Sequence, residues 1–408
     1  MLSQTELTTS QPPGAAVTAL PGQAAATPQS KRLLFIDNLR ILLMCGVLVV
    51  HLNDTYGAIG DWEYKDPVIN LLTGSILSTL NAILMACGMG IFFLISAYFT
   101  PGSYDRKGAA SFVRDRLVRL GIPIVIYDLL IQPLAVYLAG GLPGSYWSFY
   151  GNFLLQTRGI TGVVWFLVML LLFDLLYAGW RGLTSQRSSA SATRGTFPSS
   201  PAIAGFIFAL GLVTFVVRIW WPAGWTFQLL PGLKIGYLPQ YLSFYILGLV
   251  AYRRNWFFTL TSRMARDWSL IALLATLIFA GLVVPSVMQE VRAAGTQQAN
   301  YAISGGFNWL ALSYALWESF VVVGVSMGLL VLFRQRLNHQ GRLAKELAVD
   351  VYTVYLIHAP VLIGFASAFS VVALYPLLKW GIAVGVTIPL CFLISSGIRR
   401  IPLVNRVL

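Results

Sequence analysis

Residues 163–180 read "VVWFLVMLLLFDLLYAGW", and this stretch decides the fold class. Its side chains are continuously apolar around one aspartate, Asp174, and they do not alternate between apolar and polar. A membrane-spanning β-strand needs alternation over about ten residues, whereas a membrane-spanning helix needs about twenty mostly apolar residues in a row. The stretch therefore predicts a transmembrane α-helix.

Similar runs recur along the whole chain of 408 residues. Hydrophobic residues make up 57% and charged residues 11% of it, and the mean hydropathy is +0.72. A soluble domain averages about 25% charged residues. The composition thus predicts an all-α, polytopic integral membrane protein with about ten transmembrane helices. The predicted spans are 33–52, 80–100, 120–139, 160–180, 201–221, 236–252, 268–287, 309–333, 351–372 and 376–397.

One apolar region, 68–100, is too long for a single upright helix and short for two. Acidic residues precede it and basic residues follow it, which favours one crossing. Its first part, 68–79, then either lies along the membrane interface or extends the helix.

The formal net charge of +13 is explained by topology. If the N terminus and the even-numbered junctions are cytoplasmic, most of the 28 Lys and Arg residues fall on the cytoplasmic side, as the positive-inside rule requires. We therefore expect both termini in the cytoplasm and no nucleic-acid partner. We expect a disordered cytoplasmic tail at 1–30, one ten-helix membrane domain at 31–400 and a short cytoplasmic tail at 401–408. No metal-ligand spacing is found, and a homo-oligomer is left open.

The first span carries three ionisable side chains, which are costly inside a bilayer and hence candidates for function. Arg40 and His51 are eleven positions apart, about 20° past three full helical turns, so they share one face about 16 Å apart along the axis. Asp37 joins the same stripe. One interpretation is an Asp37–Arg40 ion pair with an ordinary interfacial histidine, and the other is a functional helix. Spacing alone leaves both open.

Other polar residues also lie in or next to predicted spans. Arg116 and Arg119 are three positions apart where the third span begins, so they are either a positive-inside anchor or an anion site for phosphates. His358 is placed in the cytoplasmic half of the ninth span. Glu318 is in mid-membrane, where it would be protonated or paired with an arginine, for which Arg40 is one candidate. Trp165 is interpreted mainly as packing or as part of an aromatic belt.

Three segments in order resemble a known family. "FIDNLRILLMCGVLVVH" (35–51) is similar to the first-helix signature of the membrane acyltransferase 3 family, in which an Arg and a His are separated by ten residues. "FFLISAYFTPGSYDRKGAASFVRDRLVRLGIP" (92–123) resembles its FFxISG and R-x-x-R-L-x-x-P segments, and "VYTVYLIHAPV" (351–361) its YxxYLxHxP segment. A weaker likeness is "VVWFL" at 163–167. The resemblance covers about 33–397.

The resemblance implies an O-acyltransferase in a bacterial inner membrane. Such a protein takes an acyl group from cytoplasmic acyl-CoA, commonly acetyl-CoA or succinyl-CoA, and passes it to a hydroxyl of a glycan, lipid or small molecule. The nearest branch is the one containing the periplasmic glucan succinyltransferase. Arg40 and His51 would be the catalytic pair, with Asp37 positioning the arginine, and Arg116 and Arg119 would bind the donor. His51 would act as base or acyl carrier.

Two other classes of function remain. A proton-coupled transporter would use the same intramembrane groups, with Glu318 and Asp174 as its best support, although the sequence shows no internal repeat. A non-catalytic subunit of an envelope polysaccharide machine would need none of them for chemistry.

Overall fold

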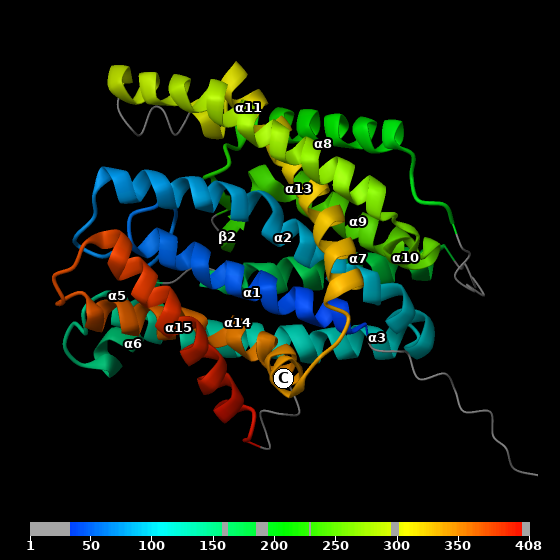
Figure 1. Cartoon of the computed structure of the whole chain (residues 1–408). Coiled ribbons are helices and arrows are strands. Elements are labelled where there is room, and N and C mark those ends of the chain that lie inside the picture. Colours follow the sequence, from blue (N-terminus) through cyan, green and yellow to red (C-terminus); the bar gives the residue numbers. More distant parts are fainter. Residues whose placement is uncertain (1–32, 157–161, 185–194, 228–229, 295–301, 402–408) are drawn as a thin grey trace, which may run out of the picture. The chain divides into compact units, whose positions relative to one another are not determined.

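The computed structural model describes residues 33–156, 162–184, 195–227, 230–294 and 302–401 (Figure 1). The expected tail at 1–30 lies outside these ranges, and so does the expected tail at 401–408 apart from Ile401. The described residues from Leu34 onward form one compact unit.

The first half of the described chain contains these helices: α1 Leu34–Thr55, α2 Leu71–Lys107, α3 Ala109–Arg116, η1 Leu117–Gly121, α4 Ile122–Ile126, η2 Tyr127–Ile131, α5 Gln132–Ala139, α6 Tyr146–Gln156, η3 Gly162–Val164, α7 Trp165–Leu183 and α8 Ser200–Trp220. The second half contains a hairpin, β1 Thr226–Phe227 with β2 Leu230–Lys234, and then η4 Ile235–Tyr237, α9 Leu238–Arg254, α10 Trp256–Thr259, α11 Ser262–Ala294, α13 Trp309–Arg336, α14 Arg342–Phe369 and α15 Pro376–Ile398.

The all-α polytopic fold is confirmed. Within the described residues, nine helices are long and apolar enough to cross a membrane. The one predicted span that is not among these nine is the sixth, 236–252, and it corresponds to α9, a helix of 17 residues that continues directly from η4. The ambiguous segment 68–79 proves to be an extension of the second span, because α2 begins at Leu71. The Asn70 side chain caps that start by accepting a hydrogen bond from the backbone N–H of Thr73 at 2.8 Å.

The ninth span begins nine residues earlier than its apolar run indicated. Helix α14 starts at Arg342 with a polar first turn and runs to Phe369, which places His358 beyond its midpoint. Because the His358 ring also packs beside His51, one turn before the far end of α1, the expectation that His358 lies in the cytoplasmic half is wrong. Hydropathy marks only the apolar part of a helix, so it missed the amphipathic turns that extend α14 at its N-terminal end.

Helix α1 lies between two groups of helices (Figure 1). It packs against α2 on one side and α14 on the other, while α8 and α11 pack on α13, which in turn packs on α2. Apolar side chains around α1, including Leu39, Leu48 and Leu52, are fully buried. The central helix thus has protein on several faces, as its polar stripe requires.

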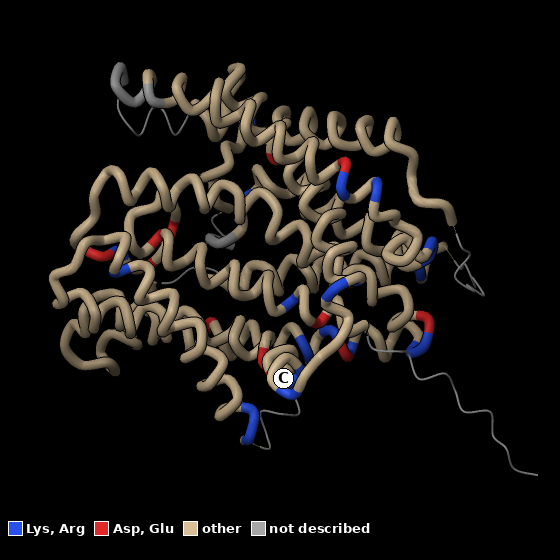
Figure 2. The backbone as a smooth tube through the Cα atoms, viewed as in Figure 1, with Lys and Arg blue, Asp and Glu red and all other residues tan. Residues whose placement is uncertain are grey.

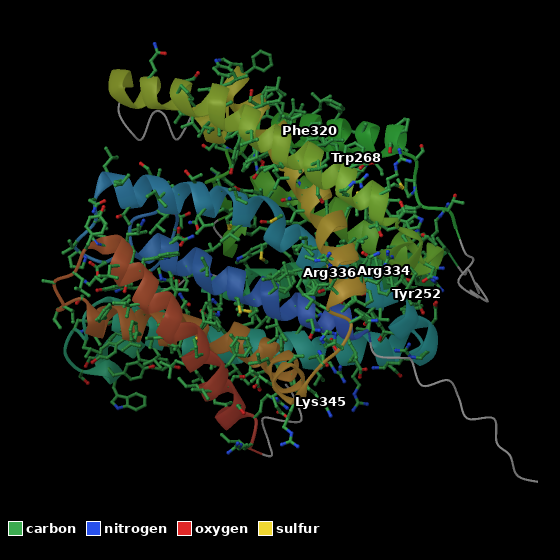
Figure 3. The ribbon with its side chains drawn as sticks, in the orientation of Figure 1. Tyr252, Trp268, Phe320, Arg334, Arg336 and Lys345 are labelled. Atoms are coloured by element: carbon green, nitrogen blue, oxygen red, sulfur yellow. The ribbon has the colours of Figure 1, made fainter. Side chains whose placement is uncertain are left out.

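Basic residues gather at one end of the bundle (Figure 2). They occupy the last turns of α2, α9 and α13, and Figure 3 shows Arg334, Arg336 and Lys345 where α13 ends and α14 begins. Arg334 donates to the backbone oxygen of Leu260 at 2.7 Å, which ties this end of α13 to the segment after α10. Helix α1 starts at the same end, so the charges agree with a cytoplasmic start of α1.

The loop between α1 and α2 folds back over the end of α1. Tyr56, Trp62 and Asp66 are buried, and burial together with the Asp66 carboxylate raises the pKa of Tyr56. The Asp66 carboxylate accepts a hydrogen bond from Lys379 at 2.7 Å, where both side chains are fully buried. Gly57 turns the chain with a φ of 121°, which L side chains rarely adopt. The loop is therefore a fixed cover of the outer end of α1.

Candidate active site

His51 lies one turn before the end of α1, directly beneath this loop. Its ring stacks on the indole of Trp62, with centroids 4.0 Å apart and planes inclined by 22°. His51 is half-buried and Trp62 is buried. The loop thus places an indole ring directly against the His51 ring.

His358 comes from α14 and meets His51 at a centroid distance of 5.2 Å, with the rings nearly parallel. Its side chain is fully buried, and its Nδ1 lies 2.7 Å from the backbone oxygen of Tyr355, one turn earlier on α14. The Trp62 and His358 rings are 6.4 Å apart, so the three rings form a triangle rather than a line. The structure therefore brings together two histidines that are about three hundred residues apart in sequence.

Each of these rings has a buried nitrogen that lacks a hydrogen-bond partner among the described residues. They are His51 Nδ1, Trp62 Nε1 and His358 Nε2. Leaving a buried polar atom unpaired costs about 1–3 kcal/mol, so three such atoms in one place are expensive for the fold. An arrangement of this kind is typical of a site that binds or transforms a polar group.

The Asp37–Arg40 ion pair is present at the other end of α1. Arg40 Nη1 lies 3.4 Å from Asp37 Oδ1, and the guanidinium stands over the Phe99 ring at 5.1 Å from its centroid. Arg40 remains about three helical turns from His51, so the two predicted catalytic residues do not touch in this structure.

Arg116 and Arg119 do not converge on one surface. Arg116 Nε lies 2.9 Å from Asp174 Oδ2, while Arg119 is exposed and lines a surface depression of about 470 Å³ together with Arg114. The cause is local, because the backbone between them enters the π-helical turn η1, which has more residues per turn than an α-helix and changes the angle between the two side chains.

The fold and this geometry agree with what comparison with known proteins shows. Residues 33–396 match the acyltransferase domain that defines the acyltransferase 3 family. The chain belongs to this family. No curated protein and no solved structure matches it.

In this acyltransferase, Glu318 is paired with an arginine, but the partner is Arg218 rather than Arg40. Arg218 Nη1 lies 2.6 Å from Glu318 Oε2, and both side chains are buried. Arg218 is in the last turn of α8, next to Glu318 on α13. Spacing along the chain could not reveal this pair, because it depends on which helices are neighbours.

Trp165 stacks on Tyr241 of α9, with ring centroids 5.4 Å apart, and so contributes to packing between α7 and α9. Among the described residues its ring contacts are with Phe166 and Tyr241, not with either histidine. Its neighbour Val163 does lie next to α14, because the backbone oxygen of Val163 accepts a hydrogen bond from the Tyr355 hydroxyl.

Sequence reasoning missed Trp62, which lies in a short loop outside the predicted spans. It also missed the neighbouring polar contacts, in which Gln132 donates to Glu63 at 3.0 Å and accepts from Tyr127 at 2.8 Å. One signal was available: Trp62 is the first tryptophan of the chain, and it follows the helix of His51 within a loop rich in turn residues. Nothing in the sequence indicated that the loop folds back.

Proposed function

We propose that this acyltransferase moves an acyl group from acyl-CoA to a hydroxyl group of a glycan, lipid or small molecule. The observation that supports this most is the meeting of His51, Trp62 and His358, each with an unpaired buried nitrogen. Acyl transfer to a hydroxyl needs a base for the hydroxyl proton or a nucleophile that carries the acyl group, and a neutral imidazole serves either purpose. Acetyl and succinyl are the acyl groups that we propose to be transferred.

Donor binding is proposed for the end of the bundle where the basic residues gather. Arg119 and Arg114 border an exposed depression that suits the phosphates of CoA, because guanidinium groups bind phosphate oxygens in pairs. Arg116, held by Asp174, would line the route from that depression towards the interior. Arg40 would orient the donor farther along α1, with Asp37 fixing the guanidinium.

The pairing of Glu318 weakens the transporter alternative. A proton-relay carboxylate has to be free to exchange its proton, but Glu318 is held 2.6 Å from the buried guanidinium of Arg218. Asp174, the other carboxylate that supported a transporter, is likewise paired, because its Oδ2 lies 2.9 Å from Arg116 Nε. The two histidines could also serve a relay, and they suit acyl transfer equally. The proposed location is the bacterial inner membrane, with the donor on the cytoplasmic side.

The test uses the full-length protein purified in lipid nanodiscs, labelled acetyl-CoA or succinyl-CoA, and an envelope extract as the source of acceptors. Wild-type protein should transfer label to an extract component, and His51→Ala should lower transfer by about 10²–10⁴-fold. His339→Ala is the matched control, because His339 is exposed in the loop between α13 and α14 and its backbone oxygen contacts Asn38, near the opposite end of α1 from His51. Equal transfer by His51→Ala and wild type would contradict the role of His51.

A further inference from the structure

The two histidines differ in how their protons are fixed. His358 Nδ1 is 2.7 Å from the Tyr355 carbonyl oxygen, and a carbonyl oxygen can only accept a hydrogen bond. The proton of the neutral ring is therefore on Nδ1, and Nε2 presents a lone pair. Nε2 is buried and has no partner among the described residues. Tyr355 is itself anchored, since its hydroxyl donates to the backbone oxygen of Val163.

His51 is held differently. Its Nδ1 is buried without a hydrogen-bond partner in the described part of the chain, and the ring is kept in place by stacking on Trp62 at 4.0 Å. Among the described residues, no hydrogen bond to Nδ1 therefore fixes which of the two ring nitrogens carries the proton. A general base works best when a third group orients it and fixes its protonation, whereas a nucleophile needs an accessible lone pair. The orientation expected of a base is found at His358.

We propose that His358 is the general base of the transfer and that His51 is the residue that carries the acyl group. This division of roles rests on the acyltransferase function proposed above. It adds a second catalytic histidine from α14 and chooses between the two roles left open for His51.

The chemistry balances in two steps. First, a nitrogen of His51 attacks the thioester carbonyl carbon, a C–N bond forms, the C–S bond breaks, and the thiolate leaves with the proton from the other ring nitrogen. Second, the acceptor hydroxyl attacks the acyl carbon while His358 Nε2 takes its proton, and a C–O bond forms as the C–N bond breaks. The proton then returns from His358 to His51, whose ring centroid is 5.2 Å away.

Trp62 supplies the hydrogen-bond donor that both steps need to stabilise the acyl oxygen. Its Nε1–H can only donate a hydrogen bond, and the group is buried and unpartnered among the described residues. Both steps develop negative charge on the acyl oxygen, and a fixed N–H donor stabilises such an oxyanion. The triangle of rings thus offers a hydrogen-bond donor on Trp62, an acceptor on His358 and, on His51, an imidazole whose tautomer is not fixed.

The deciding experiment is a single turnover in nanodiscs with labelled acyl-CoA, in which thiol release, protein-bound label and product are measured separately. The key variant is His358→Asn, whose amide can keep the hydrogen bond to Tyr355 but has no counterpart of Nε2. We expect this variant to release CoA, to retain label that hydroxylamine removes, and to form product about 10²–10⁴-fold more slowly. His51→Ala should neither release CoA nor retain label.

Two results would overturn the proposal. One is product formation at the wild-type rate by His358→Asn. The other is wild-type protein, given donor without acceptor, that carries no label on the peptide containing His51. If His358→Asn unfolds, His358→Gln replaces it, and the label on wild-type His51 still tests the carrier role. Wild-type protein that releases no CoA from any acyl-CoA tested would instead disprove the proposed function itself.

Discussion

Two buried polar centres lie within the same bundle, and they are built in opposite ways. At the first, Arg218 and Glu318 lie 2.6 Å apart, and Arg218 also donates to the Gly236 carbonyl at 3.1 Å. At the second, His51, Trp62 and His358 stack without pairing their inward nitrogens among the described residues. Both centres contain buried polar atoms without a hydrogen-bond partner among the described residues, including Arg218 Nη2 and Glu318 Oε1 at the first. They differ in that the first consists of a charge with its counter-charge, whereas the second consists of stacked aromatic rings.

This difference separates structural from chemical roles. A buried charge must be compensated, so an ion pair that joins two helices fixes their packing and leaves little free to react. An unpaired imidazole or indole nitrogen costs stability in the empty protein, and a substrate can recover that cost. We therefore expect changes at Arg218 to affect folding and changes at the histidines to affect turnover. The following predictions test that separation.

The largest effect on stability is expected for Arg218→Met. It leaves the Glu318 carboxylate buried without its partner, and loss of one member of a buried pair costs about 3–5 kcal/mol. Unfolding followed in detergent should shift to correspondingly lower denaturant concentration, while turnover per folded molecule should stay near the wild-type value.

The double variant Arg218→Met with Glu318→Leu is the control for this prediction. Because it removes both charges, it should recover most of the lost stability. If the double variant is stable but inactive, the Arg218–Glu318 pair takes part in the chemistry. The assignment of a purely structural role to this pair would then be wrong.

The next effect is expected for Trp62→Phe, which keeps an aromatic ring over His51 but removes the N–H donor. Loss of one oxyanion donor lowers kcat by about 10²-fold, so turnover should fall by that order while the unfolding transition moves little. Trp165→Phe is the matched control, since Trp165 stacks on Tyr241 away from the histidines. Equal effects of the two substitutions would point to packing alone.

A smaller effect is expected for Arg119→Met. Arg119 is exposed at the surface depression, and a charge-assisted hydrogen bond contributes about 1.5–3 kcal/mol, so KM for acyl-CoA should rise about tenfold or more with kcat nearly unchanged. Arg266→Met is the control, because Arg266 is an exposed cation next to Asp267, outside the depression. If Arg119→Met keeps the wild-type KM for acyl-CoA, the phosphates of the donor do not bind at Arg119.

The smallest effect is expected for Lys234→Met. Lys234 pairs with Asp61 beside Trp62 at 3.3 Å, but the Asp61 side chain is 71% exposed. Exposed ion pairs contribute about 0.2–1 kcal/mol and are screened by salt. Stability and turnover should therefore change little, and less at high salt. A large loss of turnover would show that this pair holds the Trp62 loop closed.

The sequence anticipated the local features of the candidate site better than its assembly. The helix that carries Arg40 and His51, their common face and the Asp37–Arg40 pair followed from spacing, because a helix has a fixed rise and rotation per residue. The shared face expected for Arg116 and Arg119 failed where η1 departs from α-helical geometry. The expected depth of His358 was wrong because an apolar run does not show which helices lie side by side, and His358 packs beside His51 near the far end of α1.

By itself the sequence determined the membrane class, the approximate spans and the asymmetry of charge, because each depends on the composition of neighbouring residues. The tertiary structure alone decided that His358 meets His51, that Trp62 folds over both, and that Glu318 is paired with Arg218. These contacts join residues on different helices and loops. Helical periodicity fixes which face a side chain occupies, but only the packing of whole helices determines which faces meet.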